Sequence, residues 1–270
     1  MKSAVCMIVK NEERLAPEWI AYHLALGFDA CLVYDNGSTD RTAEIVVRAA
    51  ALGDVRLVSW NQQSFSYQVD AYHHAIRTLG AEFDWIAFID SDEFIASPSS
   101  DNISDLLNTS EDVSGIVLNW AVFGSSGRVA RPDGLVIESY LRRAPDDFGP
   151  NCHTKMFVNT RSSAQFLNPH LAALDGLIVD VAGAEPQWTV PGVTIRPVLE
   201  PWRVNHYFTR SREDWDIKMT RGYPNVERRT GAEFAGMDRN DVVDESLLRF
   251  ADRVRALVQV IVPDGVSDPA

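Results

Sequence analysis

The chain has 270 residues, of which 46% are hydrophobic and 23% are charged, and its formal net charge is −13. This balance is typical of a folded globular protein and argues against disorder. No apolar run approaches the roughly 20 residues that a membrane-spanning helix needs. The acidic surface would repel nucleic-acid phosphates, which argues against DNA or RNA as a partner.

The first residues lead directly into a strand-like run, without the pattern of a cleavable signal peptide. We therefore expect a cytoplasmic protein, and a peripheral attachment to the inner face of a membrane stays open. Cys6, Cys31 and Cys152 lack the spacing of zinc ligands. The first two lie in apolar runs, where reduced, buried thiols are the ordinary expectation.

The first hundred residues alternate strand and helix patterns. Strands are predicted at 4–9, 30–34, 55–60 and 85–89, and helices at 16–26, about 45–52 and about 72–79. This order predicts an α/β fold with a mostly parallel central sheet flanked by helices. Ligands of such sheets bind beyond the carboxyl ends of the strands, and Lys10, Asp35 and Asp90 each follow a predicted strand.

After about residue 97 the regular alternation is lost. Strand-like runs occur at 115–123, 135–141, 155–158 and 203–208, helices are predicted at 211–221 and over about 247–261, and a tail follows from Pro263. We expect a single domain with three parts. These are a nucleotide-binding half at 1–97, an irregular α+β acceptor-side half at 98–240, and a C-terminal helix within 241–262.

Asp90 and Asp92 give the strongest local signal for chemistry. The two carboxylates are separated by one residue and directly follow a predicted buried strand. Mg²⁺ and Mn²⁺ favour oxygen ligands and commonly bridge carboxylates to substrate phosphates, where they stabilise a leaving diphosphate. The alternative is that both acids only solvate or cap a loop, and their place at the end of the fourth strand favours the metal.

Polar residues also follow the first two strands. The Asp35 carboxylate could accept a hydrogen bond from a nucleobase, although an Asx turn would satisfy the same residue. Lys10, Asn11 and Glu12 could surround a nucleotide or form a solvated loop.

Several residues of the second half have two interpretations. His170 and His206 are candidate metal ligands or phosphate contacts, with a structural histidine as the alternative. Trp120, Trp188 and Trp202 could stack on sugar rings, whereas packing in the core is the ordinary use of such residues.

Three strings of the sequence together resemble the glycosyltransferase family 2 superfamily, in a branch similar to glycosyltransferase family 92. They are MIVKNE at 7–12, YDNGSTD at 34–40 and FIDSDEF at 88–94. Weaker matches to the same branch are FGSSG at 123–127 and NHYFTRS at 205–211, followed by Lys218 and Arg221-Gly222.

The resemblance implies a GT-A fold, a UDP- or GDP-sugar donor, Mn²⁺ or Mg²⁺, and inversion at the anomeric carbon. Carried over by position, Asp35 would meet the base, Asp90 the ribose or the metal, and Asp92 the metal and diphosphate. His206 would complete the metal shell, and Lys10, Asn11 and Glu12 would belong to the donor site. We expect transfer of a hexose to a glycan, lipid or small-molecule acceptor.

Inversion needs a carboxylate that takes the proton of the acceptor hydroxyl. The pair Glu213-Asp214 before Lys218 resembles the family's arrangement, with Asp214 as the preferred base and Asp180 or Glu185 as alternatives. The ordinary interpretation of Glu213 and Asp214 is that of first-turn acids favoured by the helix dipole.

Two other functions fit parts of the sequence. A haloacid-dehalogenase-like phosphatase also carries Asp-x-Asp after an apolar strand, but on an early strand and with a following threonine that this chain lacks. A non-catalytic GT-A-like domain that binds nucleotide sugars would keep the same diacid. Metal-dependent stabilisation by UDP or GDP together with turnover would support the transferase, and binding without turnover would support the non-catalytic domain. Release of inorganic phosphate from phosphomonoesters would support the phosphatase.

Overall fold

The computed structural model describes residues 1–108, 112–221 and 229–263. Gly222 and the predicted tail beyond residue 263 lie outside these ranges. The helices are α1 (Ala16–Ala25), α2 (Thr42–Ala49), α3 (Tyr67–Leu79), α4 (Ser104–Leu107), α5 (Val136–Ser139), α6 (Arg212–Arg221), α7 (Gly231–Met237) and α8 (Ala251–Ile261), with short 3-10 turns at Gly80–Glu82, Gly149–Cys152 and Leu248–Phe250.

The strands divide into a regular N-terminal group and a more varied remainder. The first group is β1 (Ser3–Val9), β2 (Ala30–Asp35), β3 (Asp54–Ser59) and β4 (Trp85–Phe88). The others are β5 (Glu93–Ala96), β6 (Val113–Val122), β7 (Arg142–Arg143), β8 (Thr154–Asn159), β9 (Ala164–Asn168), β10 (Leu171–Leu174), β11 (Leu177–Asp180), β12 (Trp188–Val190), β13 (Val193–Thr194), β14 (Arg203–His206) and β15 (Val242–Val243).

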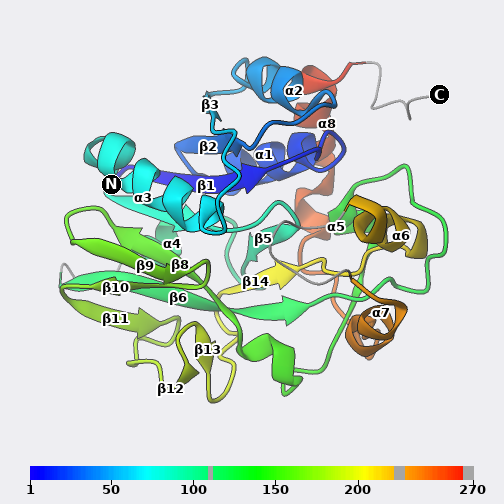
Figure 1. Ribbon diagram of the computed structural model, residues 1–270. Coiled ribbons are helices and arrows are strands. Elements are labelled where there is room, and N and C mark those ends of the chain that lie inside the picture. Colours follow the sequence, from blue (N-terminus) through cyan, green and yellow to red (C-terminus); the bar gives the residue numbers. More distant parts are fainter. Residues whose placement is uncertain (109–111, 222–228, 264–270) are drawn as a thin grey trace.

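Nine strands form the central sheet, in the order β3-β2-β1-β4-β8-β6-β14-β5, with β11 added to β6 (Figure 1). Strands β3, β2, β1 and β4 are parallel neighbours, as the sequence predicts. Strand β1 is buried on both faces, because Val5 and Met7 enter one hydrophobic cluster and Ala4 and Cys6 enter the other. The predicted α/β class with a mostly parallel, GT-A-like sheet is confirmed.

Both halves of the chain contribute to this one sheet. Strand β8 pairs antiparallel with both β4 and β6. Strand β14 is inserted between β6, which is parallel to it, and β5, which is antiparallel. The C-terminal part of the chain therefore returns next to the strand that follows Asp90 and Asp92.

Helices cover the two faces of the sheet. Helices α1, α2 and α8 pack on one another (Figure 1), and Trp19 of α1 and Val254 of α8 share one core cluster. Helix α3 packs with β9, and Tyr72 and Phe166 belong to the second cluster. No helix in the described ranges is long and apolar enough to cross a lipid bilayer.

The strand predicted at 135–141 is wrong, because Val136–Ser139 form the short helix α5. The buried carboxylate of Glu18 on α1 accepts the backbone N–H groups of Val136 and Ile137 at 2.6 and 3.0 Å. These are the N–H groups that a helix start leaves without partners. A contact across 118 residues thus overrides the local strand preference.

Candidate active site

Three parallel strands bring the sequence-predicted donor residues to one edge of the sheet. Strand β1 ends just before Lys10, β2 ends at Asp35, and β4 is followed closely by Asp90. In the register of β1 and β2, Val9 lies opposite Asp35. These residues therefore share the carboxyl edge, where ligands of such sheets bind.

Strand β14 brings His206 to Asp92. In the pairing of β14 with β5, His206 lies opposite Glu93, and the backbone N–H of Tyr207 donates to the carbonyl oxygen of Asp92 at 2.9 Å. His206 Nε2 lies 3.5 Å from Asp92 Oδ1. The backbone pairing, rather than flexible side chains, sets this separation.

Two buried lysines contact the acidic pair. Lys218 Nζ on α6 lies 2.6 Å from Asp92 Oδ2 and also donates to the Phe208 carbonyl oxygen at 2.7 Å. Lys155 Nζ on β8 lies 2.8 Å from Asp90 Oδ2. Burial alone would raise the pKa of each carboxyl. Lys155 nevertheless lowers the pKa of Asp90 below its ordinary value, and Lys218 and His206 do the same for Asp92. Both acids are therefore carboxylates at neutral pH.

Asp90 is held at three points. Besides the Lys155 contact, its Oδ1 accepts from Gln68 Nε2 at 2.7 Å, and its backbone N–H donates to Glu93 Oε2 at 2.7 Å. Burial raises the pKa of Glu93 well above the usual range, against the charge of Lys155 3.5 Å away. Asp90 is thus fixed in orientation, and both of its carboxylate oxygens already have partners.

The donor set fits a metal that takes part of its shell from substrate. The described residues contain no group of three or more His, Cys, Asp or Glu side chains placed to hold an ion. Asp92 Oδ1 and His206 Nε2 are close enough to share one ion, and burial lowers the pKa of His206, which keeps the ring neutral as a ligand must be. Mg²⁺ and Mn²⁺ commonly complete such partial sites with phosphate oxygens and water.

The turns after β1 and β2 hold each other in place. Asp35 Oδ1 accepts from Ser38 N at 3.1 Å, so the expected Asx-type turn is present. Asn11 adopts a positive φ of 56° and lies between the two turns. Its N–H donates to Ser38 Oγ at 2.9 Å, and its Oδ1 accepts from Thr39 N at 2.7 Å. Glu12 N donates to Thr42 Oγ1 at 2.8 Å, whereas the Lys10 side chain is exposed.

Asp214 is enclosed by partners. Its oxygens accept from Arg131 Nε at 2.7 Å, Ser211 Oγ at 2.7 Å and the Tyr140 hydroxyl at 3.1 Å, and Arg210 Nη1 lies 3.6 Å away. Burial raises the pKa of Asp214, but these cations and hydroxyls lower it by more, so the pKa is below its ordinary value. Lys218, which contacts Asp92, extends from the same helix as Asp214, and the lowered pKa leaves the Asp214 carboxylate ionised at neutral pH.

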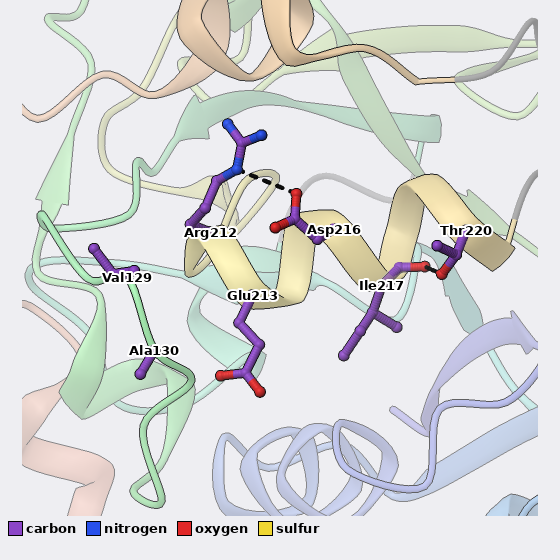
Figure 2. Close-up of a pocket in the computed structure, with 7 residues that line it drawn as sticks. All are labelled: Val129, Ala130, Arg212, Glu213, Asp216, Ile217 and Thr220. Carbon is purple, nitrogen blue, oxygen red and sulfur yellow. Dashed lines mark hydrogen bonds and ion pairs between the residues drawn. The ribbon is translucent and has the colours of Figure 1, made fainter.

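The outer side of α6 lines a pocket of about 510 Å³. Figure 2 shows Glu213 and Ile217 of α6 extending toward the same space as Val129 and Ala130. The paired acids Glu213 and Asp214 therefore have different surroundings, since only Glu213 reaches this pocket.

Asp180 and Glu185 lie in a separate cavity. They line a space of about 410 Å³ together with Asn119, Thr194 and Arg196, and neither Asp90, Asp92 nor His206 lines it. Asp180 Oδ1 accepts the backbone N–H groups of residues 182 and 184 at 2.9 and 3.0 Å. The structure does not join these alternative bases to the Asp92 cluster.

Three site residues had no role in the sequence interpretation. Lys155 is the one charged residue of the fully buried strand β8, and a lysine beside the apolar run 156–158 could have been a signal for a buried ion pair. Gln68 on α3 carries no such signal. Arg210 lies within the NHYFTRS string, is 7% exposed and has a φ of 52°. Burial lowers the pKa of Arg210, but the nearby acids outweigh this effect, so the pKa is raised above its ordinary value. These acids are Asp214, Glu12 and Asp92.

Comparison with known proteins agrees with this geometry. The family model described as glycosyltransferase family 92 matches residues 2–168, more than half of the chain. The chain belongs to this family. A family 92 protein of Oryza sativa subsp. japonica is 29% identical over 143 residues, covering 52% of this chain and 24% of the relative. One of Ricinus communis is 27% identical over 144 residues, covering 52% and 26%. The chain thus spans about a quarter of the length of these relatives.

Two solved structures with low sequence identity are also similar to parts of the chain. TarS of S. aureus in complex with UDP has a TM-score of 0.37 and 18% identity, covering 59% of this chain and 47% of that one. Glucosyl-3-phosphoglycerate synthase from Mycobacterium tuberculosis in complex with phosphoglyceric acid has the same TM-score and identity, covering 70% and 73%. Membership in family 92 leaves the phosphatase alternative without support.

Proposed function

We propose that the chain transfers a hexose from a UDP- or GDP-sugar to a glycan, lipid or small-molecule acceptor, with Mn²⁺ or Mg²⁺ and with inversion. The observation that carries this proposal is the Asp92–His206 pair, 3.5 Å apart at the carboxyl edge of the sheet. Asp35 and the turn after β1 lie at the same edge, where the base and ribose of a nucleotide would bind. One structure determined with Mn²⁺ and UDP-glucose, a glucosyl-3-phosphoglycerate synthase, is among the proteins similar to this chain.

The chemistry divides among the chain's own groups. A bound ion would act as a Lewis acid toward the diphosphate. Asp92 and His206 would hold that ion, while Lys218 keeps Asp92 ionised and oriented. The acceptor oxygen would attack the anomeric carbon as the bond from that carbon to the diphosphate breaks. The diphosphate leaves with the bonding electrons, and a carboxylate takes the hydroxyl proton.

Calorimetry and product analysis test the proposal. UDP, GDP and a panel of their hexose derivatives would be titrated with and without Mn²⁺, and released nucleotide and transferred sugar would be measured. We expect binding of one nucleotide that requires Mn²⁺ and is lost in Asp92→Asn. Asp252→Asn is the matched control, because Asp252 is fully exposed. Absence of metal-dependent nucleotide binding in the wild type would refute the proposal, and binding without turnover would favour the non-catalytic alternative.

The catalytic base stays a prediction, with Asp214 favoured by position and Asp180 by its smaller number of partners. Asp214→Asn and Asp180→Asn separate the two. Loss of a general base typically lowers the rate 10²- to 10⁴-fold, and we expect Asp214→Asn to do so while the affinity for the donor nucleotide is retained. If Asp214→Asn keeps the transfer rate of the wild type, or loses nucleotide binding and rate together, Asp214 is excluded as the base.

A further inference from the structure

Four aromatic rings, one of them His206, form a contiguous cluster beside Asp92. The Trp120 ring on β6 is at the centre, with ring centroids of His206 at 4.3 Å, His153 at 4.7 Å and His170 at 5.2 Å. His153 stacks nearly parallel to the indole at 16°, and its centroid lies 5.5 Å from that of His170. We call these four residues the histidine wall.

Hydrogen bonds fix the tautomers of two of its histidines. His170 Nδ1 lies 2.9 Å from the Thr154 carbonyl oxygen, and His153 Nδ1 lies 3.0 Å from that of Pro150. A carbonyl oxygen only accepts, so each Nδ1 carries a hydrogen, and in the tautomer with a hydrogen on Nδ1 alone the lone pair is on Nε2. Burial lowers the pKa of His170 to about 3, so this ring is neutral near pH 7.

Neither Nε2 receives a hydrogen bond from the part of the chain that the structure describes. Both residues are partly exposed. In addition, Trp120 is 8% exposed, and its buried Nε1 has no acceptor among the described residues. A buried donor without a partner is rare and calls for an explanation such as a water or ligand oxygen. The wall thus holds two acceptors on partly exposed rings and one buried donor without a partner among the described residues.

This combination distinguishes between classes of ligand. A fully ionised phosphate has no hydrogen to donate to an imidazole lone pair. A sugar ring carries hydroxyl groups that both donate and accept, and C–H faces that pack against aromatic rings. The chemistry of the wall therefore suits a neutral, hydroxyl-bearing ring.

The order of strands gives the wall a matching position. Along the sheet, β2 and β1 carry the turns around Asp35 and Asn11, β4 leads into Asp90 and Asp92, and β8, β6 and β14 follow on the other side. His153 precedes β8, Trp120 lies on β6 and His206 ends β14. The proposed diphosphate site is thus between the nucleoside side and the wall, as the order nucleoside, diphosphate, sugar requires.

We propose that the histidine wall is a sugar subsite, in which Nε2 of His153 and of His170 accept hydrogen bonds from hydroxyl groups of a pyranose ring. This inference rests on the proposed function, because the ring is either the sugar of the donor or that of an acceptor. It adds to that function the residues that recognise the sugar.

Substitutions at His170 isolate the Nε2 contact. Asn can keep the hydrogen bond to the Thr154 carbonyl oxygen while it removes Nε2, whereas the longer Gln places an amide near the Nε2 position. His74→Asn is the control, since His74 contacts Tyr34 and Trp60 and no ring of the wall. Each variant would first be compared with the wild type by thermal unfolding.

Two binding measurements then distinguish the donor sugar from the acceptor. Calorimetry compares the affinity for Mg²⁺–UDP with the affinities for Mg²⁺–UDP-glucose and Mg²⁺–UDP-galactose. It also compares the affinity for Mg²⁺–GDP with that for Mg²⁺–GDP-mannose. Saturation-transfer NMR measures methyl glucoside and methyl galactoside on protein with and without Mg²⁺–UDP. We expect His170→Asn to keep nucleotide affinity within twofold, and to lose at least fivefold in nucleotide-sugar affinity or in methyl-glycoside signal. His170→Gln should retain part of what His170→Asn loses.

The two possible failures are distinguishable. If the wild type binds no nucleotide with either Mg²⁺ or Mn²⁺, the proposed function fails, and the methyl glycosides on free protein still decide about the wall. If the wild type binds nucleotide, the wall proposal is overturned by any of three results. These are no binding of any sugar probe, unchanged sugar binding in His170→Asn, or an equal loss of nucleotide and sugar affinity.

Discussion

At the scale of single residues, buried positive charge determines how the acidic pair behaves. Asp92 is 8% exposed and Lys218 2% exposed, so their ion pair lies out of water. Such pairs add little net stability, because both charges lose their hydration. Removal of one partner is nevertheless costly, since the remaining charge stays buried.

The Asp92–Lys218 pair gives a stability prediction. We expect Lys218→Met to lower the free energy of unfolding by about 3 kcal/mol, because it leaves the Asp92 carboxylate buried without its cation. Urea unfolding would measure this loss. The double variant Lys218→Met with Asp92→Asn should recover at least half of it. A single variant within about 1 kcal/mol of the wild type would show that water, rather than Lys218, compensates Asp92.

Residues of the site differ in how far the sequence could predict them. Asp90, Asp92 and Asp35 follow predicted strands, so topology alone places them at one edge. His206 was a candidate ligand by its residue type, but the sequence could not pair it with Asp92, which lies 114 positions earlier. Lys155 and Lys218 pair with these acids across 65 and 126 residues. No local pattern contains such pairings, since they exist only once the sheet is assembled.

At the scale of elements, the FGSSG segment after β6 is fixed by the loop that follows α7. Ser125 N donates to Asp238 Oδ1 at 2.6 Å, and Ser126 N donates to Asn240 Oδ1 at 2.7 Å. A Cβ added at Gly124 would meet the Arg239 carbonyl oxygen, with Asn240 Oδ1 at 2.6 Å. Glycine is required there by the close approach of two backbones.

This close approach predicts the effect of adding one methyl group. Gly124→Ala should lower the free energy of unfolding by about 2 kcal/mol or more, because the backbone of 239–240 must shift. Gly236→Ala is the matched control within α7, where a Cβ has nothing within 4 Å. That change should raise stability by up to about 1 kcal/mol, since alanine favours helix. Chemical denaturation of both variants would check the opposite signs.

The contact between α1 and α5 makes stability depend on pH. Burial raises the pKa of Glu18 to about 7, against the two backbone N–H groups that lower it. A raised pKa means that the folded state favours the protonated acid. The resulting stabilisation is complete below the unfolded value of about 4.5 and is lost as pH rises through about 7.

We therefore expect the wild type to lose about 2 kcal/mol of stability from this group between pH 5 and 7.5. Glu18→Gln cannot ionise and should lack this component. Urea unfolding at several pH values, compared between the two proteins, isolates it from all other titrating groups. Parallel pH curves for the wild type and Glu18→Gln would contradict the assigned pKa.

The predicted elements fail where local pattern and tertiary contacts compete. Strands β1 to β4 were predicted because long apolar runs alternate with amphipathic helices. Strand β5 begins inside the acidic motif at Glu93, whose charge hides a four-residue strand that is fully buried. Helix α5 depends on the distant carboxylate of Glu18. Strand β12 is only three residues long and partly exposed, so it lacks the apolar signal of a buried strand.

At the scale of the whole molecule, the net charge of −13 opposes the binding of a diphosphate. The proposed metal shell has two ligands from the protein, so ion and nucleotide should each complete the site of the other. We expect Mn²⁺ to raise the affinity for UDP or GDP at least tenfold, and the nucleotide to raise the affinity for Mn²⁺ by the same factor. Calorimetry in both orders would measure this coupling. Independent binding of the two would contradict a shared shell.

The register of β14 against β5 has a consequence for how this protein can diverge. Side chains alternate between the two faces of a strand, so inserting or deleting one residue within 203–206 would send His206 to the opposite face and present a neighbour to Asp92. Point substitutions in these strands leave that alignment intact, whereas indels do not. Family members that retain the chemistry should therefore conserve the lengths of β5 and β14 to the residue. They should tolerate length changes in the loops between β8 and β14.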